Sequence, residues 1–342
     1  MKLTLPAIVA ALMVTSAACA QSNWQLYDTG NSGLPNNTVR CITVDTNNVV
    51  WAGTGGNGLV SFDGTNWTNY TTANSDLPGD YVLDVRIDAQ NRLWVGCVTG
   101  GAAVFDGTTW TVYNSGNSGL VNENVRHINL DDVPNVWFGT IGGVSKFDGT
   151  NWTNFTAATS DLPDDDVRDM DVDANGNIWM GTEWGLGVYD GTDWTLYNNQ
   201  NSDMVSLQAR NVLIDQHENV WLGAWQLHHF DHTDWTIWDA DSSDLCDNIV
   251  LDIYEGCFDT LWLATLENGL CKFDGTTFYD NYNSGNSPIS SNRVDMITTD
   301  GNNRFWLATW NGIVSFDRPD CGTSTGIEDE PAKAFQLFQP CY

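Results

Sequence analysis

The chain has 342 residues, of which 44 are acidic and 13 are lysine or arginine, so its formal net charge is −31. A nucleic-acid-binding protein needs a cationic surface, and this acidity argues against nucleic acid as a partner. The acidity also disfavours an anionic lipid surface, while it favours solubility.

The first predicted element is a signal peptide over residues 1–20. It has a positive start, the apolar run Leu5–Val14 and an Ala18-Cys19-Ala20 cleavage site, which makes Gln21 the first mature residue. In an alternative interpretation, Cys19 is itself the lipidated first residue. The apolar run is too short to span a membrane, and the sequence offers no other candidate span. We therefore expect a secreted or cell-surface protein, with the periplasm as second choice.

A single repeat fills the predicted propeller domain over residues 21–319. A tryptophan in a Trp-x-[Gly/Ala] setting returns every 41 to 44 residues. This period is typical of the four-stranded blades of a β-propeller. The anchoring residues are Trp51, Trp94, Trp137, Trp179, Trp221, Trp262 and Trp306. The sequence thus predicts an all-β, seven-bladed propeller with antiparallel four-stranded blades and almost no helix.

Each repeat divides into four strands, named A to D in chain order. In the first repeat, strand A covers the alternating run Val39–Val44, and strand B carries Trp51. Strand C ends in the aromatic–acidic pair Phe62-Asp63, and a Gly-Thr turn leads to strand D at Trp67–Tyr70. The same pattern of strands and turns is predicted for the later repeats.

The two ends of the repeat array complement each other. The seventh repeat stops at Phe316-Asp317 without a strand D, while Trp24–Tyr27 has the strand-D pattern and no blade of its own. We therefore predict that Trp24–Tyr27 completes the last blade and closes the ring. Closure of this kind removes an unpaired strand edge, which would otherwise promote aggregation.

The repeats resemble the two-component regulator propeller family. The matching segments are Gly33–Arg40, Asp161–Arg168 and Asn177–Thr182. The resemblance implies a propeller of the kind found in sensor regions of bacterial histidine kinases and in secreted or surface proteins. The sequence carries no kinase or response-regulator pattern, so a signalling role is not inferred.

Motifs for catalysis, cofactors and metals are missing from the sequence, and we expect neither cofactor nor metal. The glycine-rich stretch Gly53–Gly58 lies in a predicted turn between strands, without the helix that a nucleotide site needs. A calcium-like stretch begins at Asp173, but Trp184 stands where an EF-hand requires glutamate.

The histidines and cysteines give no metal-binding spacing. His228, His229 and His232 cluster in the fifth repeat, but strand alternation puts the first two on opposite faces, so surface histidines are expected rather than a zinc site. Cysteines are expected to be isolated buried thiols. A Cys257–Cys271 disulfide is one hypothesis, because the repeat places both residues near one end of a blade.

Three tryptophans remain after the repeat is accounted for. They follow the strand-B tryptophan by four or five residues, in the predicted loop between strands B and C. This loop and the D–A loop emerge on the same face of a propeller, around the mouth of its channel. An exposed aromatic cluster suits stacking on sugar rings or gripping a peptide, whereas the alternative is packing against neighbouring loops. The residues are Trp184, Trp225 and Trp310.

Four arginines share one repeat position, eleven residues before the strand-B tryptophan, at the start of strand A. They are Arg40, Arg126, Arg168 and Arg210. A partial ring of guanidinium groups could bind an anionic ligand such as a uronic or sulfated sugar. In the alternative interpretation, each arginine pairs with a carboxylate of the D–A loop, such as Asp165 or Asp166.

The segment over residues 320–342 follows the propeller. Its stretch Gly326–Gln339 resembles the opening of a type IX secretion sorting domain, although the Asn-Pro motif of that family does not follow. The alternative is a disordered acidic linker.

These features favour an extracellular binding module that recognises a glycan or a protein through its B–C and D–A loops, with no catalytic residues. One alternative is a propeller lyase or hydrolase acting on a polysaccharide or small molecule, an architecture that streptogramin lyases share. His127 in the third strand A is then the best-placed histidine. The other alternative is a structural or adhesive surface protein, because fold does not decide function.

Overall fold

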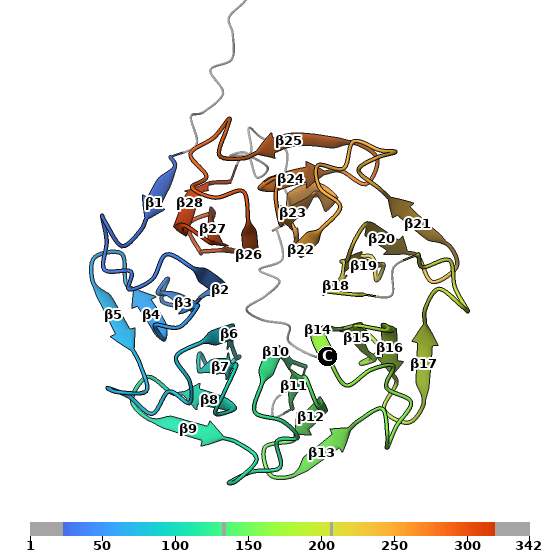
Figure 1. The fold of residues 1–342 in the computed structure, drawn as a ribbon, viewed down its shortest axis with the longest axis horizontal. Helices are drawn as coiled ribbons and strands as arrows, with labels where there is room; N and C mark the ends of the chain where they lie inside the picture. Colours follow the sequence, from blue (N-terminus) through green and yellow to red (C-terminus); the bar gives the residue numbers. More distant parts are fainter. Residues whose placement is uncertain (1–22, 132–134, 206–207, 319–342) are drawn as a thin grey trace, which may run out of the picture.

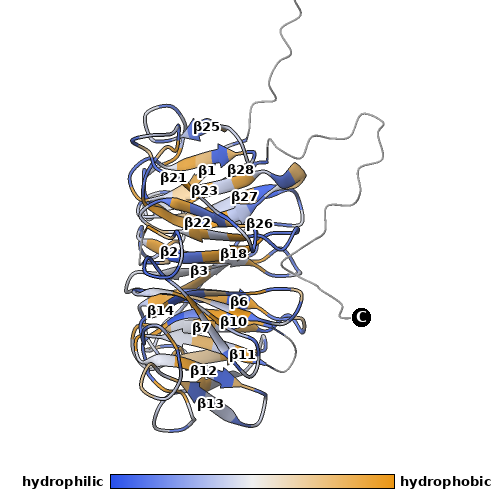
Figure 2. Cartoon of the chain, turned by 90° about the vertical axis from the view of Figure 1, so that its right-hand side faces the viewer, coloured by the Kyte–Doolittle hydropathy of each residue, from blue (hydrophilic) through white to orange (hydrophobic). Residues whose placement is uncertain are grey.

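The computed structural model describes residues 23–131, 135–205 and 208–318. Seven four-stranded antiparallel sheets surround a central axis, as predicted (Figure 1). Strand A of each blade lies nearest to the axis and strand D lies on the perimeter. In side view the ring is shallow (Figure 2). The predicted segments over residues 1–20 and 320–342 lie outside the described residues.

The strand bounds follow the repeat closely. The A strands are β2 (Val39–Val44), β6 (Val82–Ile87), β10 (Val125–Leu130), β14 (Val167–Val172), β18 (Asn211–Ile214), β22 (Val250–Glu255) and β26 (Val294–Thr299). The B strands are β3 (Val50–Thr54), β7 (Leu93–Cys97), β11 (Val136–Thr140), β15 (Ile178–Thr182), β19 (Val220–Gly223), β23 (Leu261–Thr265) and β27 (Arg304–Thr309). The C strands are β4 (Leu59–Phe62), β8 (Ala102–Phe105), β12 (Gly143–Phe147), β16 (Gly185–Tyr189), β20 (Leu227–Phe230), β24 (Leu270–Phe273) and β28 (Gly312–Asp317). The D strands are β5 (Trp67–Tyr70), β9 (Trp110–Tyr113), β13 (Trp152–Phe155), β17 (Trp194–Tyr197), β21 (Trp235–Trp238), β25 (Phe278–Tyr282) and β1 (Gln25–Tyr27), and one short 3-10 turn, η1 (Cys257–Asp259), precedes β23.

The strand-B tryptophans form the core between neighbouring blades. Trp51 packs with Val82 and Val85 of the second blade, and Trp306 packs with Val39 of the first. All seven are less than 9% exposed. Each large indole is buried between its own blade and the next, as Trp51 packs on Tyr70 of the first blade and on Phe105 of the second. The repeat therefore stabilises the contacts that hold the blades together.

A hydrogen bond explains why an aspartate stands six residues before the strand-B tryptophan in six blades. In the fourth blade, the Trp179 indole N–H donates to Asp173 Oδ2 at 3.0 Å. The other carboxylate oxygen accepts the backbone N–H groups of Asn175 and Asn177 at 2.9 Å. The calcium-like stretch is therefore a strand turn whose carboxylate is occupied by the chain itself. The sixth blade has Gly256 at this position and forms η1 instead.

Replacing Asp173 with alanine should lower the free energy of unfolding by about 1–3 kcal/mol, because a buried indole N–H and two turn amides lose their acceptor. Urea denaturation at neutral pH measures the change. Asp193→Ala, at an exposed position in the same blade, serves as control and should stay within about 0.5 kcal/mol of the wild type. Equal stabilities of the two variants would contradict this role of the carboxylate.

The N-terminal strand closes the ring as predicted. Strand β1 pairs antiparallel with β28, placing Gln25 opposite Ser315. Trp24 stacks on Phe316 with ring centroids 4.0 Å apart, as Trp67 stacks on Phe62 at 4.4 Å in the first blade. The orphan segment thus repeats the packing of an ordinary strand D.

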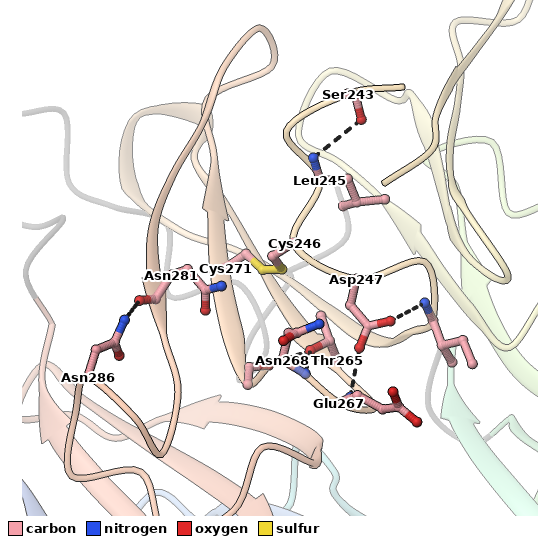
Figure 3. Close-up of a disulfide and its surroundings, with 12 residues drawn as sticks. Ser243, Leu245, Cys246, Asp247, Thr265, Glu267, Asn268, Cys271, Asn281 and Asn286 are labelled. Atoms are coloured by element: carbon pink, nitrogen blue, oxygen red, sulfur yellow. Dashed lines mark hydrogen bonds between the residues drawn. A yellow bond between two sulfur atoms is a disulfide. The ribbon is translucent and has the colours of Figure 1, made fainter. Parts of the chain in front are cut away.

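One disulfide joins the sixth blade to the loop that precedes it. Cys246 lies in the D–A loop before β22 and Cys271 lies in β24, with their Cα atoms 6.4 Å apart (Figure 3). The predicted Cys257–Cys271 pair is wrong, because Cys271 is bonded to Cys246, while Cys257 lies in the A–B turn. The expectation of isolated buried thiols is confirmed for Cys41 and Cys97 but is wrong for Cys246 and Cys271.

Candidate functional site

The B–C and D–A loops lie together on one face of the ring, which we call the mouth face. In the first blade, Gly55 of the B–C loop donates its backbone N–H to the Thr38 carbonyl of the D–A loop at 2.9 Å. Gly58 donates likewise to Asp80 of the next D–A loop at 2.8 Å. Backbone hydrogen bonds therefore join neighbouring loops of the mouth face around the axis.

The structure places the three unassigned tryptophans on the mouth face with their rings accessible. Trp184 is 59% exposed, Trp225 50% and Trp310 47%. They lie in the loops between β15 and β16, β19 and β20, and β27 and β28. Three further exposed apolar side chains, Tyr81, Ile141 and Val205, lie in loops of the same face.

Among the described residues, only Phe258 and Tyr279 are large exposed hydrophobic side chains that lie elsewhere. Phe258 belongs to η1 at the opposite face, and Tyr279 belongs to the perimeter strand β25. Exposed apolar surface is thus concentrated on the mouth face, and such concentrations mark interaction sites.

Two of the tryptophans are fixed by the same residues that hold the arginines. Gln208 Oε1 accepts the indole N–H of Trp225 at 2.8 Å and Arg210 Nη2 at 3.1 Å. Trp225 and Arg210 are therefore held side by side, with the indole face left open. A ring fixed in this way loses little conformational freedom when it binds a ligand.

Asp295 organises a second aromatic–arginine group. Its Oδ2 accepts the Trp310 indole N–H and Arg40 Nη1, both at 2.9 Å. Its Oδ1 accepts Arg293 Nε at 2.8 Å, and the Arg293 guanidinium lies 4.1 Å from the centroid of Trp310. The Arg293 guanidinium thereby covers one face of the Trp310 ring. The alternative interpretation, packing against neighbouring loops, therefore applies to part of this side chain.

The remaining two predicted arginines share a carboxylate. Arg126 lies 2.7 Å and Arg168 3.4 Å from Asp166, and Arg168 also contacts Glu183, the residue before Trp184. Three of the four arginines therefore have carboxylate partners, but only Arg126 and Arg168 pair with a carboxylate of the D–A loop, since Asp295 lies in β26. Arg210 differs, since its described side-chain partner is the amide of Gln208.

A β-bulge lies at the repeat position of Arg40, Arg126 and Arg168, whereas β18, which follows Arg210, pairs with β19 without a register shift. In six blades the register of the A–B ladder shifts at the arginine position, as between Val125 and His127 in β10. The extra residue of a bulge leaves the ladder and its side chain is redirected. Burial lowers the pKa of Arg210, and the charges of Arg293 and Arg126 lower it further. Arg210 of the fifth blade thus lies within electrostatic range of arginines from the third and seventh blades.

Sequence reasoning missed three residues of this arrangement, Gln208, Arg293 and Asp295. The signal was an inversion in the seventh blade, where Asp295 takes the arginine position and Arg293 stands two residues earlier. The pattern of one blade could not reveal that Asp295 binds Arg40, because the two residues meet only when the ring closes.

A buried polar layer lies one residue deeper along the A strands. Asp84, Asp169 and Asp252 each accept a backbone N–H from strand A of the next blade, and these bonds lock blades together. The donors are Ile128 (2.7 Å), Val212 (2.7 Å) and Ile297 (2.8 Å). The buried carboxylates therefore have a structural role between blades.

His127 belongs to this layer. Its Nδ1 lies 2.5 Å from Asp169 Oδ1 and 3.6 Å from Asp84 Oδ2, and the residue is 6% exposed. Arg86 Nη2 approaches the same nitrogen at 3.3 Å. The histidine that the lyase alternative requires is thus held by carboxylates within the ring.

One carboxylate of the layer, Asp252, and the nearby Asp171 of β14 have perturbed acidities. Burial raises the pKa of Asp252 to about 7, and the neighbouring Asp169 charge raises it as well, while the bond from Ile297 N–H opposes this. Burial likewise raises the pKa of Asp171 to about 6. At neutral pH part of the layer is protonated, which moderates the repulsion among its acidic groups.

The histidine cluster of the fifth blade does not converge. His228 is fully buried, and burial lowers its pKa to about 4. His229 lies on the opposite face of β20 and its ring is 4.3 Å from that of Trp221. The expectation of surface histidines is therefore wrong for His228, which packs inside its blade. Within the described part of the chain, no group of three metal-binding side chains converges.

A hollow of about 680 Å³ lies between the D–A loop that follows β13 and the C–D turn of the fourth blade. Its lining includes Phe155, Tyr189 and Trp194 from the third and fourth blades. These aromatic residues belong to the strand C and strand D packing that every blade repeats.

Comparison with known proteins defines the repeat. The family model described as "Two component regulator propeller" matches residues 33–56 and 161–184. The propeller is of the two-component regulator type. No curated protein matches the sequence.

Solved structures resemble this regulator-type propeller at low identity. The extracellular domain named for a hybrid two-component system of B. thetaiotaomicron has a TM-score of 0.74 and 22% identity over 86% of this chain and 41% of that one. This chain therefore spans about two fifths of that domain. At such identities the likeness shows the fold.

Two further neighbours have different described roles. PorZ, a surface component of the type-IX secretion system of Porphyromonas gingivalis, has a TM-score of 0.69 and 16% identity over 87% of this chain and 49% of that one. Virginiamycin B lyase from Staphylococcus aureus has a TM-score of 0.69 and 13% identity over 86% of this chain and 99% of that one. In the described part of the regulator-type propeller, no helix is long and apolar enough to cross a membrane.

Proposed function

We propose that this regulator-type propeller is a binding module, displayed outside the cytoplasm, that holds a glycan or a protein on its mouth face. The supporting observation is the gathering of exposed Trp184, Trp225 and Trp310 on that face. Soluble proteins seldom leave several large aromatic rings open on one surface unless a partner covers them. The extracellular and surface neighbours support display outside the cytoplasm.

Binding is favoured over catalysis by the state of His127. A general base must reach the proton that it removes, and its ring must therefore be open to substrate. His127 is 6% exposed and contacts Asp169 and Asp84. We infer that it acts as a connector between blades.

The triple variant Trp184→Ala, Trp225→Ala, Trp310→Ala tests the proposal on glycan and peptide arrays. Loss of one aromatic anchor typically weakens binding by about 2 kcal/mol, or roughly 30-fold, so the triple variant should fall below detection on most positive spots. Phe258→Ala with Tyr279→Ala removes exposed aromatics elsewhere and should bind as the wild type does. Equal binding by the triple variant, or no binding by the wild type on either array, would refute the mouth face as the binding site.

A further inference from the structure

Positive charge at the channel mouth exceeds its described partners. Five arginines, Arg40, Arg126, Arg168, Arg210 and Arg293, meet three carboxylates, those of Asp166, Glu183 and Asp295. The charge of Asp164 also acts on Arg168, so these five arginines exceed the carboxylates that contact or act on them by one, in a chain with a net charge of −31. Guanidinium groups gathered without matching carboxylates favour an external anion.

Hydrogen-bond donors at the mouth are also unsatisfied. The Nε atoms of Arg40, Arg168 and Arg210 are buried and have no acceptor in the described structure. Buried donors without partners are costly, and native proteins seldom retain them unless a water or ligand supplies the acceptor. The shortage of anionic acceptors is greatest at Arg210, for which the described chain supplies a neutral amide oxygen instead of a carboxylate.

We propose that the mouth binds a glycan carrying one uronate in an otherwise neutral chain, with the carboxylate on Arg210 and the sugar ring on Trp225. This inference rests on the proposed function of the mouth face. A uronic sugar combines a planar anion with an apolar ring face, and the shared Gln208 contact holds one complementary group for each. Arg126, Arg168 and Arg293 provide the surrounding positive field.

The acidity of the surrounding protein surface limits the number of negative charges that the ligand can carry. A polyanion would extend from the mouth across an acidic surface and would be repelled there. A single carboxylate meets only the arginine group. The half-exposed face of Trp225 is available for a pyranose ring, which favours a sugar over a peptide end as the source of the carboxylate.

Isothermal titration of the mature chain with two matched probes tests this inference. One probe is a neutral oligosaccharide ending in a single glucuronate, and the other is the same compound with its carboxyl group reduced to the alcohol. The wild type should prefer the uronate at least tenfold. Arg210→Gln should bind both probes with the affinity that the wild type has for the reduced one, and Trp225→Ala should weaken both.

The control is Arg92→Gln, which removes the same charge at the opposite face, beside Asp88, and should keep the tenfold preference. Thermal melts confirm that each variant folds. Equal binding of both probes by the wild type, with Trp225→Ala still weakening both, would overturn the anion site and leave the mouth face as a binding surface. Unchanged binding by Trp225→Ala would refute both proposals. A peptide that binds through a free but not an amidated C-terminus, with no binding of the uronate, would overturn the choice of a sugar.

Discussion

Deletion of residues 23–27 is expected to open the ring, to lower the urea midpoint of unfolding sharply and to make the protein associate. The deletion removes β1 and exposes the whole edge of β28, whose unpaired N–H and C=O groups can pair with another chain. It also uncovers Phe316, which loses the stacked ring of Trp24. Urea denaturation and light scattering after size exclusion measure the two effects.

The single change Trp24→Ala separates packing from strand loss. It should cost about 3 kcal/mol, the lower end for removal of a large aromatic side chain, since Trp24 is only partly buried. Trp67→Ala is the matched control, because it removes the equivalent stacked ring from the first blade, whose four strands come from one continuous stretch of chain. The control should be destabilised but should remain monomeric. A synthetic peptide of residues 23–28 should restore the stability of the chain that lacks residues 23–27. A monomeric deletion variant with an unchanged urea midpoint would contradict the role of β1 as the closing strand.

The second large effect is on the pH dependence of stability. The folded-state pKa of Asp252 is raised to about 7 by burial, whereas an unfolded aspartate titrates near 4. Between these values the folded chain holds a proton that the unfolded chain has released, so stability decreases as pH rises from about 4 to about 7 and then levels. Asp171, raised to about 6, contributes in the same direction.

Asp252→Asn should remove most of this decrease and make the protein more stable than the wild type at pH 8 by a few kcal/mol. The oxygen of the substituted amide can still accept the Ile297 N–H, while the amide nitrogen replaces the oxygen that accepts Asn211 Nδ2 at 3.1 Å, and the loss of that bond offsets part of the gain. Unfolding free energies from pH 4.5 to 8.5 provide the comparison, with exposed Asp193→Asn as control. A variant whose stability declines with pH as steeply as that of the wild type would show that Asp252 does not carry the effect.

The repeat made the architecture predictable from the sequence. Seven equivalent tryptophans fixed the number of blades, and the mismatch between Trp24–Tyr27 and the incomplete seventh repeat identified the closing strand. Subtraction of the repeat also found Trp184, Trp225 and Trp310, since residues that the fold does not require stand out against seven copies.

Contacts across the ring were not predictable in this way. Arg40 binds Asp295, 255 positions away, and periodicity says which residues share a position but not which copies pair. The buried layer of Asp84, His127 and Asp169 escaped notice because its position holds different residue types in different blades. The Cys246–Cys271 pair was missed because it joins a loop to a strand within one blade, which no repeat spacing encodes.

The closing strand also determines how the ring responds to mechanical load. Because β1 and β28 are antiparallel, the start of β1 lies beside the end of β28, where Asn23 Nδ2 donates to Asp317 Oδ2 at 2.7 Å. Tension applied between the two ends of the chain would therefore peel this pair apart one hydrogen bond at a time, the geometry that yields at low force. The seventh blade would therefore open first under tension. The six other blades, each formed from one continuous stretch of chain, would bear the load only afterwards.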